Sequence, residues 1–259
     1  GIVNTLDNLD AAGLAHVGTH RSLEEKSTPF IVDIEGIKVA FLNYTDYLNE
    51  FTPPKPHREY AVNVLDYRDW TELVEEAEAA RAAGADVVIT VLHWGREFCT
   101  RPWDYQVDLA EGSEDEEGLL ARGVDVILGA HPHVVEPIVR VPQYSGRETR
   151  DTYVVYSMGN FMSGMKGKRT SIGVIVYVNI EKQGRETRVT GIDYLPVMMQ
   201  QSGPYPRKLR VLPVMPGLEP ETDTTVTESD QERMDWTWEY LYGHLCRPED
   251  NIHPLDLPE

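Results

Sequence analysis

The stretch GVDVILGAHPH, residues 123–133, decides the fold of this chain. Its apolar, partly β-branched run ends at Gly129 and predicts a buried strand. Because Pro132 disfavours the helical region for the residue before it, we expect His131 to be extended. Side chains two residues apart project to the same side of an extended chain. His131 and His133 are therefore predicted to point together beyond the strand end, and neutral imidazole is the commonest side-chain metal ligand.

The same construction appears earlier, in GADVVITVLH at residues 84–93. It aligns with residues 123–131, apart from a one-residue difference in strand length, and it ends in His93. A glycine, an apolar strand and a histidine in the same order twice predict two parallel strands with their carboxyl ends side by side. Open α/β sheets bind ligands at that edge, so His93 is expected near His131 and His133. A hydrogen-bonded structural histidine is the alternative for His93 taken alone.

Each of these strands is expected to follow a helix. The first helix is predicted over residues 70–83. The second is predicted over residues 114–122, because Ser113 and Glu116 have the S-x-x-E spacing of a capping box. The acidic run at residues 111–117 then has a structural explanation, since a helix dipole favours acids at the N-terminus.

A third strand end follows in YVVYSMGNF, residues 153–161, where Gly159 breaks the strand and presents Asn160. Taken alone, Asn160 has the residue type of a turn or a cap. Together with the histidines of the two other strand ends it forms a convergent polar cluster. Three histidines with one open position are a ligand set of catalytic zinc sites, and the candidate ligands of such a metal ion are His93, His131 and His133.

Three blocks of the sequence resemble the CapA family of bacterial capsule synthesis proteins. They are HWGRE at residues 93–97 followed by Pro102 and Gln106, GAHPHVVEP at residues 129–137, and YSMGNF at residues 156–161. The opening of the chain and the hairpin around residue 36 are also similar to that family. In all, the resemblance extends from residue 1 to residue 212, which is most of the chain.

The resemblance implies an α/β fold of the calcineurin-like metallophosphoesterase type, a sandwich of mixed β-sheets flanked by helices. It also implies a divalent metal ion (manganese, zinc or iron) and a place in the cell envelope or on its extracellular face. Family members normally carry an upstream Gly-Asp strand end, an acidic residue and an Asn-Asn-His block that supply further metal ligands. This chain begins after that block, so we expect the fold and the metal site to be incomplete at the N-terminus.

The resemblance further assigns roles to individual residues. His131 and His133 are expected to be metal ligands, and His93 a ligand or a general acid. Glu97 and Asn160 are expected to orient ligands or substrate and to form the catalytic set with His93. A structural ion pair is an equal alternative for Glu97. Substrate contacts are expected from Arg96, Gln106 and Ser157.

The formal net charge of −19 argues against nucleic acids and anionic membrane surfaces as partners. It also opposes an anionic polymer ligand, because like charges repel. Metal ions or a local basic patch would have to offset this repulsion. The candidates for such a patch are Arg96, Arg101, Lys166, Lys168 and Arg169, although each of them taken singly is better explained as a solvated loop charge.

Several other classes of protein are disfavoured. No apolar run approaches the roughly 18–20 residues that span a bilayer. Cys99 and Cys246 match no zinc or redox motif, and a disulfide between them is not favoured. His244 and Cys246 are likewise not expected to form a metal pair.

The rest of the chain is mainly architecture. Hairpins are expected over residues 30–42 and 172–197. Residues 45–49 end a strand and are expected to border the cleft. The proline-rich residues 53–57 predict a rigid loop with His57 at its surface.

The sequence predicts one domain over residues 1–215 and a C-terminal arm over residues 216–259. Residues 216–230 are rich in proline, threonine and acids, which predicts a linker. Residues 229–245 predict a helix whose apolar positions pack on the core or on a second copy of the chain. Residues 247–259 are expected to form an irregular tail.

Two functions of different kinds follow. The first is a capsule or poly-γ-glutamate biosynthesis protein that acts as a metal-dependent hydrolase or transferase on amide or phosphoester linkages of an envelope polymer. The second is a non-catalytic polymer-binding or assembly component with an incomplete metal site. In both, the partner is an anionic polymer such as poly-γ-glutamate, or another envelope glycan or peptide. A plain phosphodiesterase is a third alternative, which fold analogy alone does not decide.

Overall fold

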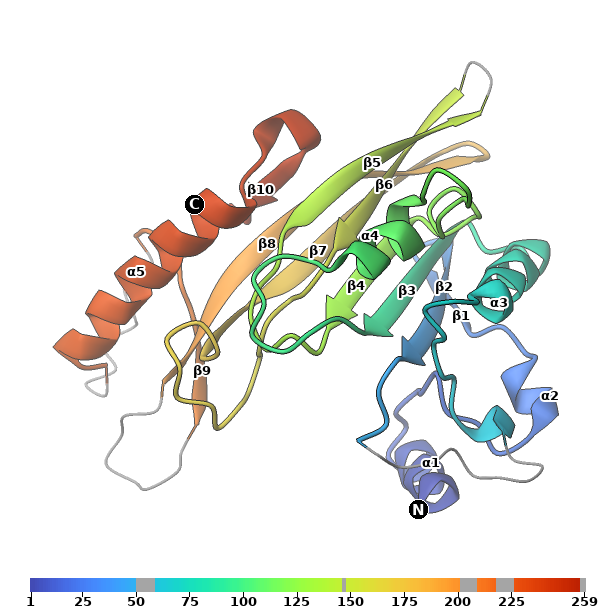
Figure 1. The fold of residues 1–259 in the computed structure, drawn as a ribbon, viewed down its shortest axis with the longest axis horizontal. Coiled ribbons are helices and arrows are strands. Elements are labelled where there is room, and N and C mark those ends of the chain that lie inside the picture. The colour runs from blue at the N-terminus through green and yellow to red at the C-terminus, as the bar shows by residue number, and fades with distance from the viewer. Residues whose placement is uncertain (50–58, 146–147, 201–208, 218–225, 257–259) are drawn as a thin grey trace.

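Two β-sheets pack against each other, with helices on the outer face of one sheet and a long C-terminal helix beside the core between the two sheets (Figure 1). The structure is a computed structural model that describes residues 1–49, 59–145, 148–200, 209–217 and 226–256. The expected proline-rich loop with His57, and part of the expected linker, lie outside these residues. The arrangement confirms the predicted fold class, in which mixed sheets are flanked by helices.

The first sheet has six strands in the order β1-β2-β3-β4-β6-β5. Strands β2, β3, β4 and β6 are parallel, whereas the edge strands β1 and β5 are antiparallel to their neighbours. Parallel strands bring their carboxyl ends to one edge, so the predicted convergence of β3 and β4 is confirmed. The strands are β1 (Ile31–Ile34), β2 (Ile37–Thr45), β3 (Val87–His93), β4 (Val126–Ala130), β5 (Ile138–Ser145) and β6 (Glu148–Val155).

The second sheet is built mainly from the long hairpin of β7 (Ile172–Gln183) and β8 (Glu186–Gln200). Two short strands pair with β8, namely β9 (Arg210–Pro213) and β10 (Ile252–Pro254). The presence of β10 shows that the prediction of an irregular tail is wrong. The tail is ordered because Ile252 is fully buried in the core and its strand runs parallel to β8.

The helices are α1 (Ile2–Ala11), α2 (Leu23–Lys26), α3 (Thr71–Ala82), α4 (Asp104–Glu111) and α5 (Glu228–Leu245), with short 3₁₀ turns η1 (Glu59–Ala61) and η2 (Pro248–Asp250). The helices predicted before β3 and near the C-terminus are confirmed as α3 and α5. The helix predicted over residues 114–122 is wrong, because α4 ends earlier and those residues form turns. Gly112 terminates α4 with φ of 101°, and the acidic run follows a helix instead of starting one.

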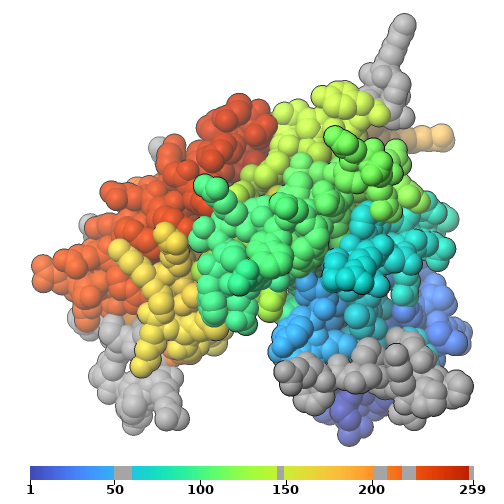
Figure 2. Space-filling view, in the orientation of Figure 1, coloured from blue at the N-terminus to red at the C-terminus, as the bar shows by residue number. Residues whose placement is uncertain are grey.

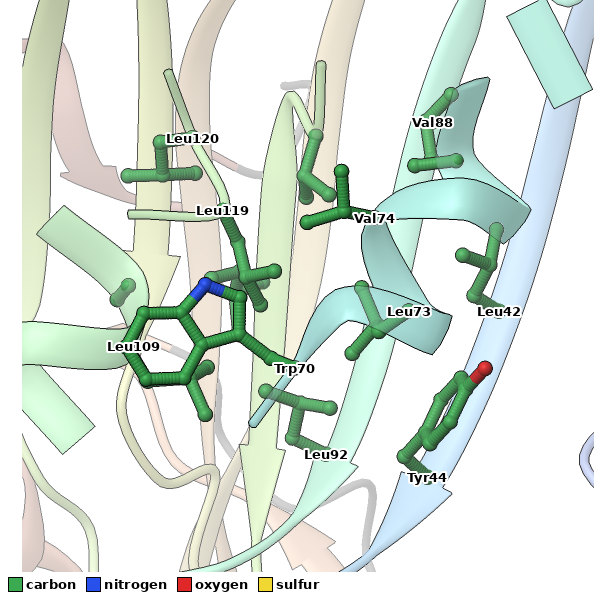
Figure 3. Packing of buried hydrophobic residues seen from close by; sticks show 14 of the residues in the cluster. Leu42, Tyr44, Trp70, Leu73, Val74, Val88, Leu92, Leu109, Leu119 and Leu120 are labelled. Atoms are coloured by element: carbon green, nitrogen blue, oxygen red, sulfur yellow. The ribbon is translucent and has the colours of Figure 1, made fainter. Parts of the chain in front are cut away.

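The first core lies between the six-stranded sheet and the helices α3 and α4 (Figure 3). Leu73 and Val74 of α3 share this cluster with Leu42 of β2, Leu92 of β3 and Leu109 of α4. All five side chains are at most 3% exposed. Burial of each such side chain contributes about 1.5–3 kcal/mol to folding.

The second core lies between the two sheets and is closed by α5. It joins Val87 and Tyr153 of the first sheet to Ile192 of the second sheet and to Met234 and Leu241 of α5. The helix therefore packs on the chain's own core, as the first alternative for it predicted. Residues on both sides of the expected boundary at residue 215 share this cluster.

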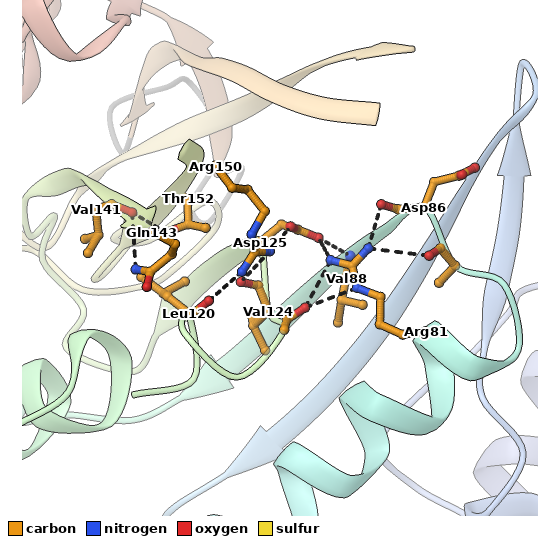
Figure 4. Close-up of polar contacts among 12 residues, drawn as sticks. Arg81, Asp86, Val88, Leu120, Val124, Asp125, Val141, Gln143, Arg150 and Thr152 are labelled. Atoms are coloured by element: carbon orange, nitrogen blue, oxygen red, sulfur yellow. Dashed lines mark hydrogen bonds and ion pairs between the residues drawn. The ribbon is translucent and has the colours of Figure 1, made fainter. Parts of the chain in front are cut away.

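A buried ionic network ties the amino ends of the parallel strands to α3 (Figure 4). The Asp125 carboxylate, in the loop before β4, accepts hydrogen bonds from both Arg81 of α3 and Arg150 of β6. It also accepts one from the backbone N–H of Val88, at 2.7 Å. Asp125 is 5% exposed, so its charge depends on these partners.

The predicted hairpins agree with the structure. Both expected hairpins are present, as β1–β2 and β7–β8. Cys99 and Cys246 are free thiols. In the part of the chain that the structure describes, no helix is both long enough and apolar enough to cross a membrane.

Candidate functional site

The candidate site lies at the carboxyl edge of the parallel strands. The sheet register pairs Thr45 with His93 and His93 with Ala130, so the ends of β2, β3 and β4 are adjacent. The ring centroids of His93 and His131 are 4.4 Å apart, and those of His131 and His133 are 6.3 Å apart. The three histidines that the sequence singled out therefore gather at one place.

The backbone of the two histidines after β4 differs from the prediction. His131 was expected to be extended, but it has φ of 103°, and His133 has φ of 61°. Pro132 disfavours the right-handed helical region of the preceding residue, which leaves positive φ open. The bend is fixed by a hydrogen bond from Phe98 N–H to the Pro132 carbonyl, at 2.8 Å. Positive φ at residues other than glycine is strained and tends to cluster at functional sites.

Asn160 sets the orientation of the His133 ring. The Asn160 amide nitrogen donates to the carbonyls of His133 (3.3 Å) and Thr170 (2.9 Å). The amide oxygen is thereby turned toward His133 Nδ1, at 2.9 Å. An amide oxygen only accepts, so Nδ1 is a donor, and in the neutral ring Nε2 is the nitrogen with the free lone pair. His133 Nε2 lies 3.8 Å from a Glu97 carboxylate oxygen.

Thr45 does the same for His93. The Thr45 hydroxyl donates to the Tyr47 carbonyl at 3.0 Å, and it lies 3.0 Å from His93 Nδ1. Since the only hydroxyl proton is used, Nδ1 of His93 is the donor and its Nε2 is left as an acceptor. Burial, reinforced by the charge of His131, lowers the pKa of His93, which keeps the ring neutral near pH 7. Neutral imidazole is the metal-binding form.

Asp46 lies directly beside these histidines. One of its oxygens, Oδ2, accepts hydrogen bonds from the Tyr105 hydroxyl (2.8 Å) and the Gly95 N–H (3.2 Å). The other, Oδ1, is buried without a hydrogen-bond partner among the described residues and lies 3.9 Å from His93 Nδ1. Burial and the Asp46 charge raise the pKa of Tyr105, so this phenol stays protonated and holds the carboxylate in place.

A cleft of about 750 Å³ opens beside His131. Its charged lining consists of Asp46, Arg96 and Glu97. The Arg96 guanidinium lies 5.0 Å from the Trp103 ring centroid, a cation–π contact that leaves its charge available. The aromatic walls, each more than two-fifths exposed, are Tyr47, Tyr67, Phe98 and Trp103.

Two of the predicted substrate-binding residues lie beneath the cleft. Gln106 is fully buried, and its side-chain oxygen accepts from Trp103 N–H at 2.9 Å, which caps α4. Ser157 is also fully buried, and its hydroxyl accepts from Gly159 N–H at 3.2 Å. Both side chains support the backbone around the site and do not reach its surface. Arg96, by contrast, lines the cleft as expected.

The donor set fits a metal ion in part. Two imidazoles have a hydrogen-bond partner on Nδ1, and partners on that ring nitrogen are typical of histidines that bind a metal through Nε2. The unpartnered Asp46 oxygen is a further acceptor that a cation would satisfy. Within the described residues, however, no three side chains of histidine, cysteine, aspartate or glutamate are close enough together to hold one ion. A complete metal site therefore needs a further ligand from outside the described residues, or a movement that brings the candidate ligands closer together.

Sequence reasoning missed part of this site. Thr45 and Asp46 were expected only to border the cleft, although they end β2 just as His93 ends β3. Because the ends of parallel strands lie side by side, the position of Thr45 and Asp46 at the end of a predicted strand could have indicated that they belong to the site. Tyr105 and Trp103 carried no such signal, because their positions depend on how α4 packs.

Comparisons with known proteins agree with this picture. The sequence matches the family described as bacterial capsule synthesis protein PGA_cap over residues 1–165. PGA biosynthesis protein CapA of Bacillus subtilis (strain 168) is 30% identical over 210 residues, which are 80% of this chain and 49% of that protein. Capsule biosynthesis protein CapA of Bacillus anthracis is 23% identical over 206 residues, 80% of this chain and 46% of that protein. The chain thus spans about half the length of these curated relatives.

Among solved structures, sulfate thiohydrolase SoxB of Thermus thermophilus in complex with glycerol is similar, with a TM-score of 0.34 and 20% identity. The match covers 85% of this chain and 30% of that chain, and we draw no functional conclusion from it. The family match spans the three histidines, Asp46, Asn160 and the residues that line the cleft. It confirms the resemblance seen in the three sequence blocks. The chain belongs to the bacterial capsule synthesis protein (PGA_cap) family.

Proposed function

We propose that this chain carries the histidine side of a metal-dependent hydrolase or transferase that acts on amide or phosphoester linkages of a capsule polymer at the cell envelope. The observation that carries the proposal is the gathering of His93, His131 and His133, with Thr45 and Asn160 fixing two of the rings. Such outer partners are characteristic of metal-binding histidines. Membership of a capsule synthesis family supports the polymer as partner and the envelope as location.

A divalent ion such as manganese, zinc or iron would be held by His93, His131 and His133, whose side chains would have to move closer together for all three to reach one ion. When bound, it would polarise the scissile group and lower the pKa of a coordinated water. The Asp46 oxygen that lacks a hydrogen-bond partner would add negative charge beside it.

The chain's own residues prepare the chemistry in three ways. Thr45 and Asn160 each hold the Nδ1 atom of one ring, so in the neutral rings of His93 and His133 the Nε2 atoms are turned toward the site as acceptors. His93, when it is not a ligand, is placed to pass a proton to a leaving group. Glu97, at 3.8 Å from His133 Nε2, adds negative charge that favours a cation.

The cleft supplies the binding surface. Its aromatic walls exclude water from one side of a bound chain, and large exposed aromatic rings are typical of ligand grooves. Arg96 is held on the face of Trp103 with its charge unneutralised, and it would orient an anionic group of the substrate.

A non-catalytic polymer-binding or assembly component is the second candidate. The observation that favours it is that no three potential ligands are arranged to hold one ion in the described residues. Under this alternative the same cleft binds polymer and no bond is cleaved.

Metal retention tests the proposal. The purified chain is equilibrated with manganese, zinc or iron(II), dialysed, and its metal content measured by mass spectrometry. We expect near-stoichiometric metal in the wild type and in His253→Ala, a histidine of β10 outside the site. We expect none in the double variant His131→Ala/His133→Ala. Absence of metal from the wild type would favour the non-catalytic component.

A further inference from the structure

We propose that three exposed cations beside the candidate site, Lys166, Lys168 and Arg169, form a docking site for a polycarboxylate chain, poly-γ-glutamate. We call them the basic loop. This inference rests on the proposed function and deepens it, because it assigns the part of the chain that receives the polymer. Four observations carry it: the local charge, its aromatic support, its link to the histidines, and the charge around it.

The basic loop concentrates positive charge on a strongly acidic molecule. The net charge of the chain is −19, so a polyanion is repelled from most of its surface. Within the described residues, the ion pairs of arginine and lysine are all made by other side chains. Lys166, Lys168 and Arg169 are exposed, and none of them forms an ion pair with a carboxylate of the described residues.

Two of these cations are held in place by aromatic rings of α5. Lys168 Nζ lies 3.9 Å from the centroid of the Trp236 ring, and the Arg169 guanidinium carbon lies 5.6 Å from that of Tyr240. Trp236 and Tyr240 are stacked on each other, one helical turn apart, with centroids at 5.0 Å and planes 9° apart. A cation–π contact fixes a cation without cancelling its charge, whereas a salt bridge cancels it. The basic loop is therefore positioned in advance and keeps its charge for a ligand, which reduces the ordering cost of binding.

The same loop is tied to the candidate metal-binding histidines. Residues at both ends of it contact Asn160, whose amide nitrogen lies 3.7 Å from Met165 Sδ and 2.9 Å from the Thr170 carbonyl. The amide oxygen of Asn160 lies 2.9 Å from His133 Nδ1. Figure 2 shows the segment after Asn160, in yellow, beside the orange α5. A chain held by the basic loop is thus adjacent to His133.

The charge pattern indicates what the loop binds. Arginine pairs with carboxylates in a bidentate geometry and lysine attracts them as a point charge, so a ligand with regularly spaced carboxylates uses both. On α5, Glu232 and Glu239 lie one helical turn to either side of Trp236, so carboxylates of the ligand are repelled from the exposed surface of the helix and directed to the cations of the loop. A capsule-synthesis protein meets this kind of polymer in poly-γ-glutamate.

The test compares two variants of equal net charge. In the first, Lys166, Lys168 and Arg169 are changed to glutamate. In the matched control, Arg122, Arg185 and Arg188 are changed to glutamate. The control residues lie toward the amino ends of the parallel strands, where the β7–β8 hairpin contacts the β1–β2 turn through the Lys182–Gly36 hydrogen bond. Binding of fluorescein-labelled poly-γ-glutamate is measured by anisotropy in EDTA, at low salt and at about 0.5 M NaCl, where surface charges are screened.

We expect the basic-loop variant to bind at least tenfold more weakly than wild type and the control to bind within about threefold. Wild-type binding should weaken strongly in salt, and that salt dependence should be nearly lost in the basic-loop variant. Trp236→Leu keeps an apolar side chain but removes the ring under Lys168, and it should weaken binding severalfold. Wild-type affinity in the basic-loop variant, or equal losses in both triple variants, would overturn the inference.

This result is separable from that of the metal experiment. EDTA removes any metal contribution, so polymer binding is read without it. Loss of the docking inference leaves metal retention by the histidines untouched. Conversely, a chain that retains no metal but binds the polymer through the basic loop would refute the enzymatic proposal alone.

Discussion

At the scale of single residues, the site depends on Thr45 and Asn160, which determine the ring nitrogen that carries the proton in His93 and His133. The sequence predicted the histidines because each ends a strand or follows one directly, and strand ends converge in a parallel sheet. It did not predict which ring nitrogen carries the proton. That depends on Thr45 and Asn160, which come from other strand ends and meet the rings only in the folded chain.

Removal of the Thr45 hydroxyl should release the His93 ring. We expect Thr45→Val, which keeps the shape of the side chain, to lower the affinity for a divalent metal at least tenfold, because outer partners of ligand histidines contribute about 10- to 100-fold. Calorimetric titration with zinc measures this. Thr45→Ser keeps the hydroxyl and serves as the control, with an affinity within about twofold of wild type. Equal affinities in all three proteins would contradict the assigned role of Thr45.

Glu136 offers a test of stability against pH. Its side chain is fully buried, and this burial raises its pKa to about 7 from the ordinary value of 4.5. The folded state therefore holds a proton that the unfolded state releases, so stability falls as pH rises from about 4.5 to 7. Glu136→Gln removes this penalty. The variant should exceed wild type by about 3 kcal/mol at pH 8 and by less than about 1 kcal/mol at pH 5.

Urea denaturation at the two pH values measures this difference. The exposed Glu116→Gln is the matched control and should match wild type at both pH values. A Glu136→Gln advantage that is the same at pH 5 and pH 8 would show that the Glu136 proton is not its cause.

At the scale of elements, strands were predicted better than the helix before β4. Hydrophobic runs that follow a glycine and lead to a histidine located β3 and β4, because these strands are buried on both faces. The capping-box spacing of Ser113 and Glu116 misled, since the same residues close a turn once Gly112 has ended α4. The turn stays compact because Leu119 and Leu120 are fully buried beneath it.

The network around Asp125 holds α3 to the strands β3, β4 and β6. Asp125→Ala would leave Arg81 and Arg150 without their carboxylate, and we expect it to lower the free energy of unfolding by about 3 kcal/mol. Urea denaturation measures the loss. Glu186→Ala breaks an exposed pair with Arg188 and should cost under about 1 kcal/mol. Similar losses in both variants would contradict the structural role of Asp125.

Gly129 is required by the close packing of β4 against the segment after β6. A Cβ at this position would lie 1.9 Å from the Tyr156 carbonyl oxygen and 2.6 Å from Trp94 Nε1. We therefore expect Gly129→Ala to cost more than about 4 kcal/mol or to prevent folding. Gly164→Ala, where a Cβ meets nothing within 4 Å, should change stability by less than about 0.5 kcal/mol. Thermal denaturation followed by circular dichroism distinguishes these outcomes.

At the scale of the whole molecule, the sequence predicted the class of fold but not its division into layers. The resemblance predicted mixed sheets flanked by helices, which the structure confirms. The sequence did not determine what α5 packs against, because its apolar face could pack on the chain's own core or on a second copy of the chain. Only the packing of Met234 and Leu241 into the core between the sheets decides this.

The excess negative charge should make the fold dependent on salt. Self-repulsion at a net charge of −19 destabilises the compact state, and added salt screens it. We expect the melting temperature to rise by about 2 to 4 °C between low salt and about 0.5 M NaCl, which corresponds to roughly 1 kcal/mol. The variant Arg122→Glu/Arg185→Glu/Arg188→Glu, which is still more acidic, should show a larger rise. A melting temperature independent of salt in both proteins would contradict this expectation.

The two short strands that flank β8 have a further consequence. β9 pairs with residues 197–200 of β8 and β10 with residues 192–194, so together they occupy backbone groups that β7 does not. An uncovered strand edge is a template for pairing with another chain, and such edges promote aggregation. The residues of β9 and β10 therefore act as a cover against unwanted self-association. Shortening the chain before Ile252 would open this edge, and the protein would then tend to associate through β8 before it lost its fold.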